Sequence, residues 1–242
     1  MTDRYQPKMM PQQPEGLFEK AMHAGQNLPG KPGFICYRKL KRRYRWRNED
    51  IWPKLVADLR AGDLCIDLGA NLGEVTTQLA NAGAEVIGFE PDPDTFARLV
   101  QNVGQMPGVT LYQQAAGAKA DTLNLRRSAR MAEDPDRFSQ SASLVRNDAT
   151  MDDTNTVPVE VINLPEFLAG LDRDIRILKM DIEGSEWDLM PALMEHPVLD
   201  RIDTIFVETH EWMDPARYMP IAHRLQAQAE ARDHPYINLF WH

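Results

Sequence analysis

Residues 64–73 read Leu-Cys-Ile-Asp-Leu-Gly-Ala-Asn-Leu-Gly, an apolar run that ends in a loop with two glycines. A helical pattern over residues 73–82 follows at once. A buried strand, a glycine turn and a helix in this order are typical of a parallel α/β sheet, whose ligand crevice lies beyond the carboxyl ends of the strands. The stretch therefore predicts that a nucleotide-like cofactor binds beside Gly69 and Gly73.

The same alternation continues along the chain. Short apolar runs predict strands at residues 63–68, 85–90, 109–116, 175–183 and 204–210. Helical spacing predicts helices at residues 48–59, 73–82, 94–105, 185–194 and 215–232. Strands that alternate with helices predict a doubly wound, mostly parallel sheet with helices on both faces.

Two segments depart from this rhythm. Residues 121–162 contain β-like pieces at 123–127, 142–145 and 157–162 around a polar stretch with Asp148, Asp152 and Asp153, and we interpret them as an insertion at the ligand-facing edge of the sheet. Residues 1–32 are rich in Pro, Gln and Gly and predict a loose arm with one short helix at 15–23. We therefore divide the chain into an N-terminal arm, residues 1–47, and one cofactor-binding domain, residues 48–242.

Composition limits the partners. The net charge of −9 argues against broad nucleic-acid binding. The basic run from Arg38 to Arg47 is the local exception: we favour a solvated or docking helix face, and the alternative is contact with phosphate or an anionic membrane surface.

Only Cys36 and Cys65 are present, which favours a reducing, cytoplasmic location, and no apolar run approaches the length that membrane insertion needs. Composition leaves the oligomeric state open.

The first loop favours a methyl donor over a dinucleotide. Dinucleotide binding uses G-x-G-x-x-G to bring a helix N-terminus to a pyrophosphate, and this loop lacks the middle glycine. S-adenosylmethionine carries cationic groups that Asp67 could meet directly or through water. Glu90, at the end of the second predicted strand, can accept hydrogen bonds from ribose hydroxyls. The small residues Ala115 and Ala116 leave room for an adenine ring.

Ionisable side chains gather at the ends of the fourth and fifth predicted strands. A period of two places Lys179, Asp181 and Glu183 on one side of the strand at residues 175–183, where burial is costly unless they pair or bind a ligand. Glu208 and His210 end the neighbouring strand. Methyl transfer to an alcohol needs a base for the hydroxyl proton, and His210 or Asp181 could be that base.

Structural roles for these residues remain open. Lys179 and Asp181 could form a buried ion pair, Glu186 could be a carboxylate that favours a helix N-terminus, and His210 could have no catalytic duty. The carboxylates also offer the oxygen ligands that Mg²⁺ prefers, so a magnesium ion that orients a diol is an alternative to the metal-free reaction that we predict.

Taken together, these motifs resemble the FkbM-type methyltransferases. The resemblance rests on the D-x-G-A-N-x-G loop at residues 67–73, Phe89-Glu90-Pro91, Ala115-Ala116-Gly117, the K-x-D-x-E-G-x-E run at residues 179–186 and Val207-Glu208. It implies a class I, Rossmann-like methyltransferase fold, S-adenosylmethionine as donor and O-methylation of polyketide-like, sugar or other small-molecule hydroxyls.

Site residues follow from this resemblance by position. It implies that Asp67, Gly69 and Gly73 line the methionine end of the donor, that Glu90 binds the ribose, that Ala116 lies near the adenine, and that Asp181 and Glu183 face the reacting end. With the residues next to them, the predicted donor site comprises Asp67, Gly69, Ala70, Asn71, Gly73, Glu90, Pro91, Ala116 and Asp181. The candidate catalytic residues are Lys179, Asp181 and His210, and those for the acceptor are Glu183 and Glu208.

The favoured function is therefore O-methylation of a small hydroxylated acceptor. A non-catalytic module that binds the cofactor and recruits a partner, nucleic acid or membrane through its basic arm is the alternative. A nicotinamide-dependent oxidoreductase is disfavoured by the first loop and by the lack of an evident Tyr/Lys or Ser/Tyr pair after the fourth strand.

Overall fold

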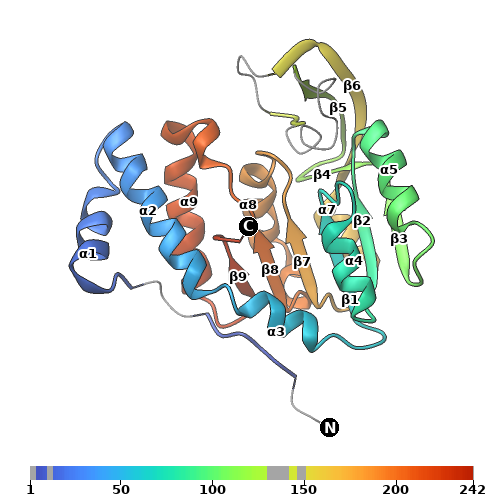
Figure 1. Cartoon of the computed structure of the whole chain (residues 1–242), viewed down its shortest axis with the longest axis horizontal. Coiled ribbons are helices and arrows are strands. Elements are labelled where there is room, and N and C mark those ends of the chain that lie inside the picture. The colour runs from blue at the N-terminus through green and yellow to red at the C-terminus, as the bar shows by residue number, and fades with distance from the viewer. Residues whose placement is uncertain (1–3, 10–12, 130–141, 146–150, 242) are drawn as a thin grey trace.

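The computed structural model describes residues 4–9, 13–129, 142–145 and 151–241 (Figure 1). Its main sheet has six strands in the order β3-β2-β1-β7-β8-β9, and every neighbouring pair is parallel. The strands are β1 (Leu64–Leu68), β2 (Glu85–Phe89), β3 (Val109–Tyr112), β7 (Ile177–Met180), β8 (Thr204–Val207) and β9 (Tyr236–Asn238). The predicted doubly wound, Rossmann-like α/β fold is confirmed.

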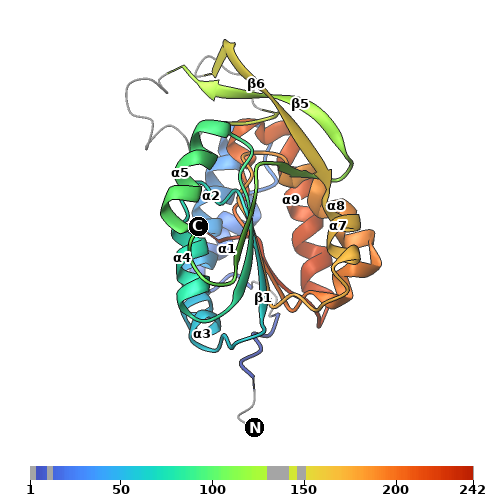
Figure 2. The same ribbon diagram turned by 90° about the vertical axis from the view of Figure 1, so that its right-hand side faces the viewer.

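Helices cover both faces of this sheet (Figure 2). The helices α3 (Ile51–Ala57), α4 (Glu74–Asn81) and α5 (Pro93–Val103) lie on one face, and α7 (Leu164–Gly170), α8 (Glu186–Glu195) and α9 (Pro215–Glu230) lie on the other. Strand β1 serves both layers, because Ile66 and Leu68 join the core under α8 and α9 while Cys65 joins the core under α4. A strand buried on both faces reads as a near-continuous apolar run, which in β1 only Asp67 interrupts.

The order of the strands fixes where a ligand can bind. From β1 the chain moves outward to β2 and β3, then returns to β7 on the other side of β1 and moves outward to β8 and β9. The carboxyl ends of β1 and β7 therefore flank the point at which the winding reverses, where open α/β sheets form their crevice.

A second sheet lies across this end of the molecule (Figure 1). Strands β4 (Ala115–Gly117), β6 (Met151–Asn163) and β5 (Asp121–Ser128) form it in that order, with β5 and β6 antiparallel. Strand β5 and most of β6 lie within residues 121–162, and the interpretation of this segment as an insertion stays a prediction. Its middle piece is a single bridge between Arg126 and Ser143 rather than a strand. Of the polar stretch, Asp152 and Asp153 lie in β6, and Asp148 lies outside the described residues.

Three predicted strands need correction. The strand predicted at 204–210 ends at Val207, so Glu208 and His210 lie in the loop beyond β8. Residues 109–116 form not one strand but two, because β3 ends at Tyr112 in the main sheet and β4 begins at Ala115 in the second sheet. The strand predicted at 175–183 ends at Met180, so Asp181 and Glu183 lie in the loop beyond it. Glu183 has a left-handed backbone (φ 49°), and a turn therefore sets its direction in place of the alternation of a strand.

The N-terminal segment is more ordered than a loose arm. Residues Gly16–Gly25 form α1, and Lys31–Arg47 form α2, a helix of 17 residues that the Pro and Gly of this segment obscured. Tyr37, Leu40 and Tyr44 of α2 are buried, and Leu40 and Tyr44 pack with Phe240. The boundary between residues 47 and 48 stays a prediction. Of the helices described, none is both long and apolar enough to cross a membrane.

Candidate active site

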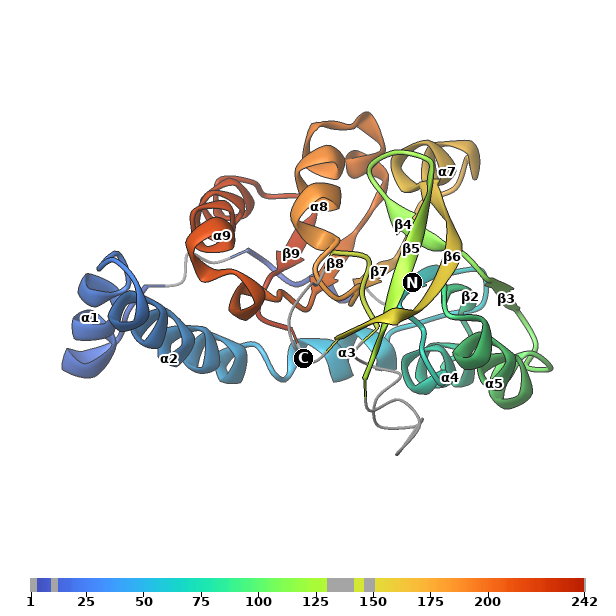
Figure 3. The same ribbon diagram turned by 90° about the horizontal axis from the view of Figure 1, so that it is seen from above.

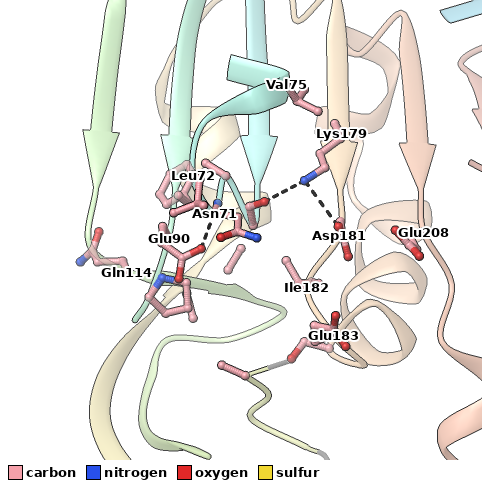
Figure 4. A pocket seen from close by; sticks show the side chains of 18 of the residues that line it. Asn71, Leu72, Val75, Glu90, Gln114, Lys179, Asp181, Ile182, Glu183 and Glu208 are labelled. Atoms are coloured by element: carbon pink, nitrogen blue, oxygen red, sulfur yellow. Dashed lines mark hydrogen bonds and ion pairs between the residues drawn. The ribbon is translucent and has the colours of Figure 1, made fainter. Parts of the chain in front are cut away.

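A cavity of about 400 Å³ opens at the carboxyl ends of β1, β2, β7 and β8 (Figure 4). This volume lies within the range of small-molecule sites. The insertion contributes Leu125, Ala142 and Leu144 to its wall. The loops after the strands contribute Gly69, Ala70, Asn71, Leu72, Glu90, Pro91, Asp181, Ile182, Glu183 and Glu208.

The glycine loop follows the floor of this cavity because Gly69 allows a close approach of two backbones. Gly69 has φ +74°, and a Cβ atom there would lie 1.8 Å from the carbonyl oxygen of Asp181. No larger residue fits this position without moving the loop or the end of β7. Glycine is needed at position 73 for a different reason, since a Cβ atom there would lie 2.8 Å from Val103 of α5. Gly73 thus serves helix packing and does not line the cavity.

Glu90 lies in the cavity wall and is 8% exposed. Its carboxylate accepts hydrogen bonds from the backbone N–H groups of Asn71 (3.0 Å) and Asp92 (2.9 Å), which join the first loop to the second. Burial raises the pKa of Glu90 to about 7, against the effect of these two hydrogen bonds. Each oxygen retains capacity to accept a hydroxyl hydrogen from a ligand.

Lys179 and Asp67 form a buried ion pair beneath the loop. Lys179 Nζ lies 3.1 Å from Asp67 Oδ1 and donates to the carbonyl oxygens of Leu68 (3.2 Å) and Gly69 (2.8 Å). The other oxygen of Asp67 accepts from Thr76 Oγ1 at 2.7 Å. Burial lowers the pKa of Lys179, but the charges of Asp67 and Asp181 outweigh it and the pKa is raised. Asp67 is fully buried and, unlike Lys179, is not part of the cavity wall.

His210 joins the loops after β7 and β8. Its Nε2 lies 3.8 Å from Asp181 Oδ1 and 3.6 Å from Glu183 Oε2. On the opposite side of the ring, Nδ1 and the backbone N–H both meet one oxygen of Glu186 at 2.9 Å. The other oxygen of Glu186 accepts from the backbone N–H of Gly184 at 2.8 Å. Because a carboxylate accepts, Nδ1 carries a hydrogen and Nε2 is directed at the two carboxylates of the cavity.

These neighbours change the titration of the cluster. Burial alone would lower the pKa of His210, but the hydrogen bond to Glu186 and the charges of Glu186, Glu183 and Asp181 raise it to about 9. Burial raises the pKa of Glu183 to about 7, although His210 opposes this. Burial likewise raises the pKa of Asp181, opposed by Lys179 and supported by Glu208. The cluster can thus hold and release a proton near neutral pH.

The same cluster has the spacing of a metal site. One ligand atom each from Asp181, Glu183 and His210 lie within 4.8 Å of one another. An oxygen-rich set with one imidazole suits several divalent ions. The ion pairs of His210 already account for this arrangement, so the reaction without metal stays our prediction.

The structure brings most of the predicted site residues together. Of the predicted donor residues, Gly69, Ala70, Asn71, Glu90, Pro91, Ala116 and Asp181 line the cavity, as do Lys179, Glu183 and Glu208. His210 is not part of the cavity wall but lies next to Asp181 and Glu183, which are. Sequence reasoning missed Glu186 as the partner of His210, and it also missed Gln114, Val75 and Trp241 in the wall. Trp187 is a core residue stacked on Tyr218, whereas Trp212 is exposed and lies 6.4 Å from the His210 ring.

Comparison with known proteins agrees with this geometry. Residues 67–234, more than half of the chain, match the family described as the methyltransferase FkbM domain. The chain belongs to this family. The match begins at Asp67 and includes the ends of β7 and β8, so the resemblance predicted from the motifs is confirmed.

Two individual proteins are also similar. Hexuronic acid methyltransferase AglP of Haloferax volcanii is 24% identical over 169 residues, which cover 69% of this chain and 64% of that protein. The chain thus aligns with less than two thirds of the length of this curated relative. A crystal structure of PH1948 from Pyrococcus horikoshii, described as a candidate RNA methyltransferase, covers 84% of this chain and 77% of its own with 13% identity and a TM-score of 0.33.

Proposed function

We propose that this FkbM-family chain uses S-adenosylmethionine to methylate a hydroxyl group of a sugar or another small molecule. The observation that carries the proposal is the cluster of Asp181, Glu183 and His210 at a cavity whose opposite wall is the glycine loop and Glu90. The cavity thus offers one set of polar groups to a donor, at the glycine loop and Glu90, and another to an acceptor, at the cluster. The similarity to AglP, named as a hexuronic acid methyltransferase, supports a sugar-like acceptor.

The loop side fits the donor. Glu90 presents a buried carboxylate to the cavity, which suits a pair of ribose hydroxyls, and Ala115 and Ala116 leave a flat space beside it. Residues 69–72 bring backbone close to the ligand without bulky side chains on Gly69 and Ala70. When bound, S-adenosylmethionine supplies an electrophilic methyl group and a sulfur leaving group.

The acceptor side fits a hydroxyl. Asp181, Glu183 and Glu208 present oxygen atoms that accept hydrogen bonds, so they select groups that donate them. His210 can take the hydroxyl proton through Nε2 or through Asp181, while Glu186 holds the ring in place. This pairing of an acceptor cluster with a positioned imidazole favours an enzyme over a module that only binds the cofactor.

A methyl-transfer assay tests the proposal. The protein is incubated with S-adenosylmethionine labelled on its methyl group and with a panel of neutral sugars, uronic acids, phenols and amines. We expect label in hydroxylated acceptors and none in amines. Transfer to amines alone would contradict the O-methylation, and tight donor binding without transfer to any acceptor would favour the binding module.

The pH profile tests the positioning role of Glu186. Glutamine at this position lacks the negative charge that raises the pKa of His210, so the rising limb of kcat/KM against pH should move down by about 1 unit or more. In the unchanged protein this limb should have its midpoint at or below about 9, since a bound cation only lowers that pKa.

The matched control is Glu195→Gln, which removes a carboxylate from the exposed end of the same helix. It should leave the limb in place. Donor affinity, measured by calorimetry, confirms that each variant is folded. An unmoved limb in Glu186→Gln would show that His210 does not set the pH dependence.

A further inference from the structure

The outer face of α2 is exposed and rich in basic residues. Its inner face is buried through Tyr37, Leu40 and Tyr44. On the outside, five exposed side chains follow one another at i, i+3, i+4, i+7 and i+11, and we call them the α2 stripe: Ile35, Arg38, Lys39, Arg42 and Trp46. This spacing keeps them on one side of a helix about 25 Å long.

The α2 stripe is strongly basic in an acidic protein. Eight of the 27 Lys and Arg residues of the chain lie in α2, which contains no Asp or Glu, whereas the whole chain has a net charge of −9. Lys41 and Arg47 point inward and pair with Glu211 and Glu19. Arg38, Lys39 and Arg42 form no ion pair with any residue that the structure describes. Their charge is available to an external anion.

Exposed apolar side chains accompany these cations. Ile35 is 52% exposed and Trp46 49%, and α1 adds Leu17 at 89% and Phe18 at 47%. Arg42 and Arg43 lie 5.8 and 5.2 Å from the centre of the Trp46 ring. Basic heads beside exposed aliphatic and aromatic groups are typical of helices that lie in a membrane interface.

We propose that the α2 stripe, with the neighbouring side chains of α1, docks this enzyme on a membrane surface that contains anionic lipids. Lipid headgroups complement the cations, and the acyl boundary accommodates Ile35, Trp46 and Phe18, whose ring lies against Lys39 of the stripe. Nucleic acid fits less well, because aliphatic groups gain nothing from phosphate and cationic side chains already lie against the Trp46 and Phe18 rings that bases would stack on.

The position of the stripe is compatible with catalysis. Helices α1 and α2 lie at one end of the molecule, beside α9 and away from β3 and α5 (Figure 1, Figure 3). They contribute no residue to the wall of the cavity among the residues described. The enzyme can therefore rest on a surface through α2 with its cavity open.

Vesicle co-sedimentation tests the proposal. The full chain is mixed with vesicles of phosphatidylcholine alone or with about a third of phosphatidylserine, at low and high salt. We expect binding to the anionic vesicles only, and its loss as salt rises. In the double variant Arg38→Glu with Arg42→Glu, binding should fall at least about 10-fold, since each cation contributes about 5-fold. Trp46→Ala should weaken binding several-fold without changing the charge.

The control is Lys54→Glu with Lys119→Glu, which makes the same charge change at exposed positions outside α1 and α2. It should retain most of the binding. Donor affinity must stay unchanged in every variant, which shows that the cavity is intact. The proposal is overturned if the anionic vesicles do not bind, if the control loses as much as the double variant, or if a single-stranded oligonucleotide binds in place of the vesicles.

Discussion

Replacing His210 with Ala should lower kcat by about 10²–10⁴-fold, the usual contribution of a positioned general base. The imidazole Nε2 is the basic atom beside Asp181 and Glu183, and its pKa of about 9 gives it a strong affinity for the hydroxyl proton. His210 lies behind the cavity wall, so the affinity for S-adenosylmethionine should change little. Steady-state rates and calorimetric donor binding measure the two effects separately.

The control for this variant is His23→Ala, which removes an exposed imidazole from α1. Its turnover should equal that of the unchanged protein. Undiminished turnover in His210→Ala would exclude His210 as the base and would transfer that role to Asp181. A rate loss accompanied by an equal loss of donor affinity would show that His210 supports the cavity and not the proton transfer.

Replacing Asp67 with Ala should lower the free energy of unfolding by about 3–5 kcal/mol, the typical cost of removing one partner of a buried ion pair. Lys179 would keep its two backbone carbonyl partners and Asp181 at 3.9 Å but would lose its nearest counter-charge. A urea titration measures the change. Donor binding should weaken as a consequence, because Lys179 also fixes the carbonyl group of Gly69.

Thr76→Val is the matched control. It removes the hydrogen bond from Thr76 to Asp67 but leaves the ion pair, and we expect a loss of about 1 kcal/mol. If Asp67→Ala lost no more than this control, the pair would not hold the loop. If Asp67→Ala abolished donor binding at full stability, Asp67 would act on the donor itself, as the family resemblance implies.

Local sequence was sufficient to predict that the glycine loop and Glu90 lie at the ligand-facing edge of the sheet, where they line the cavity. Gly69 and Glu90 follow directly after strands, so their motifs identify both the residue and its place at the sheet edge. Parallel strands bring such ends together whatever the rest of the chain does. For this reason the sequence also predicted that Asp181, Glu183 and His210 lie at the same edge of the sheet.

The relations between these residues could not be predicted. Glu186 and His210 are 24 residues apart in the sequence. They meet only because the first turn of α8 lies beside the loop that follows β8. Likewise, the motif predicts that Asp67 faces a ligand, but its carboxylate forms an ion pair with the buried amino group of Lys179. Both outcomes depend on the packing of distant segments, which spacing alone does not report.

The α2 helix was missed for a different reason. Its buried residues Tyr37, Leu40 and Tyr44 have helical spacing, but five cations lie between Tyr37 and Tyr44 and obscure the apolar pattern. The loose arm was predicted to extend to Pro32, although proline is well tolerated in the first turn of a helix.

In the proposed function, the cavity at the carboxyl ends of β1 and β7 binds a methyl donor with Glu90 on the ribose. Calorimetric titration with S-adenosylmethionine, S-adenosylhomocysteine and NADH tests it most directly, at pH 8 so that Glu90, with a pKa of about 7, is ionised. We predict saturable binding of the two sulfur ligands, no binding of NADH, and at least about 10-fold weaker donor binding in Glu90→Gln, because hydrogen bonds to a charged group contribute about 1.5–3 kcal/mol each. Binding of NADH, or donor affinity that Glu90→Gln leaves unchanged, would contradict the account.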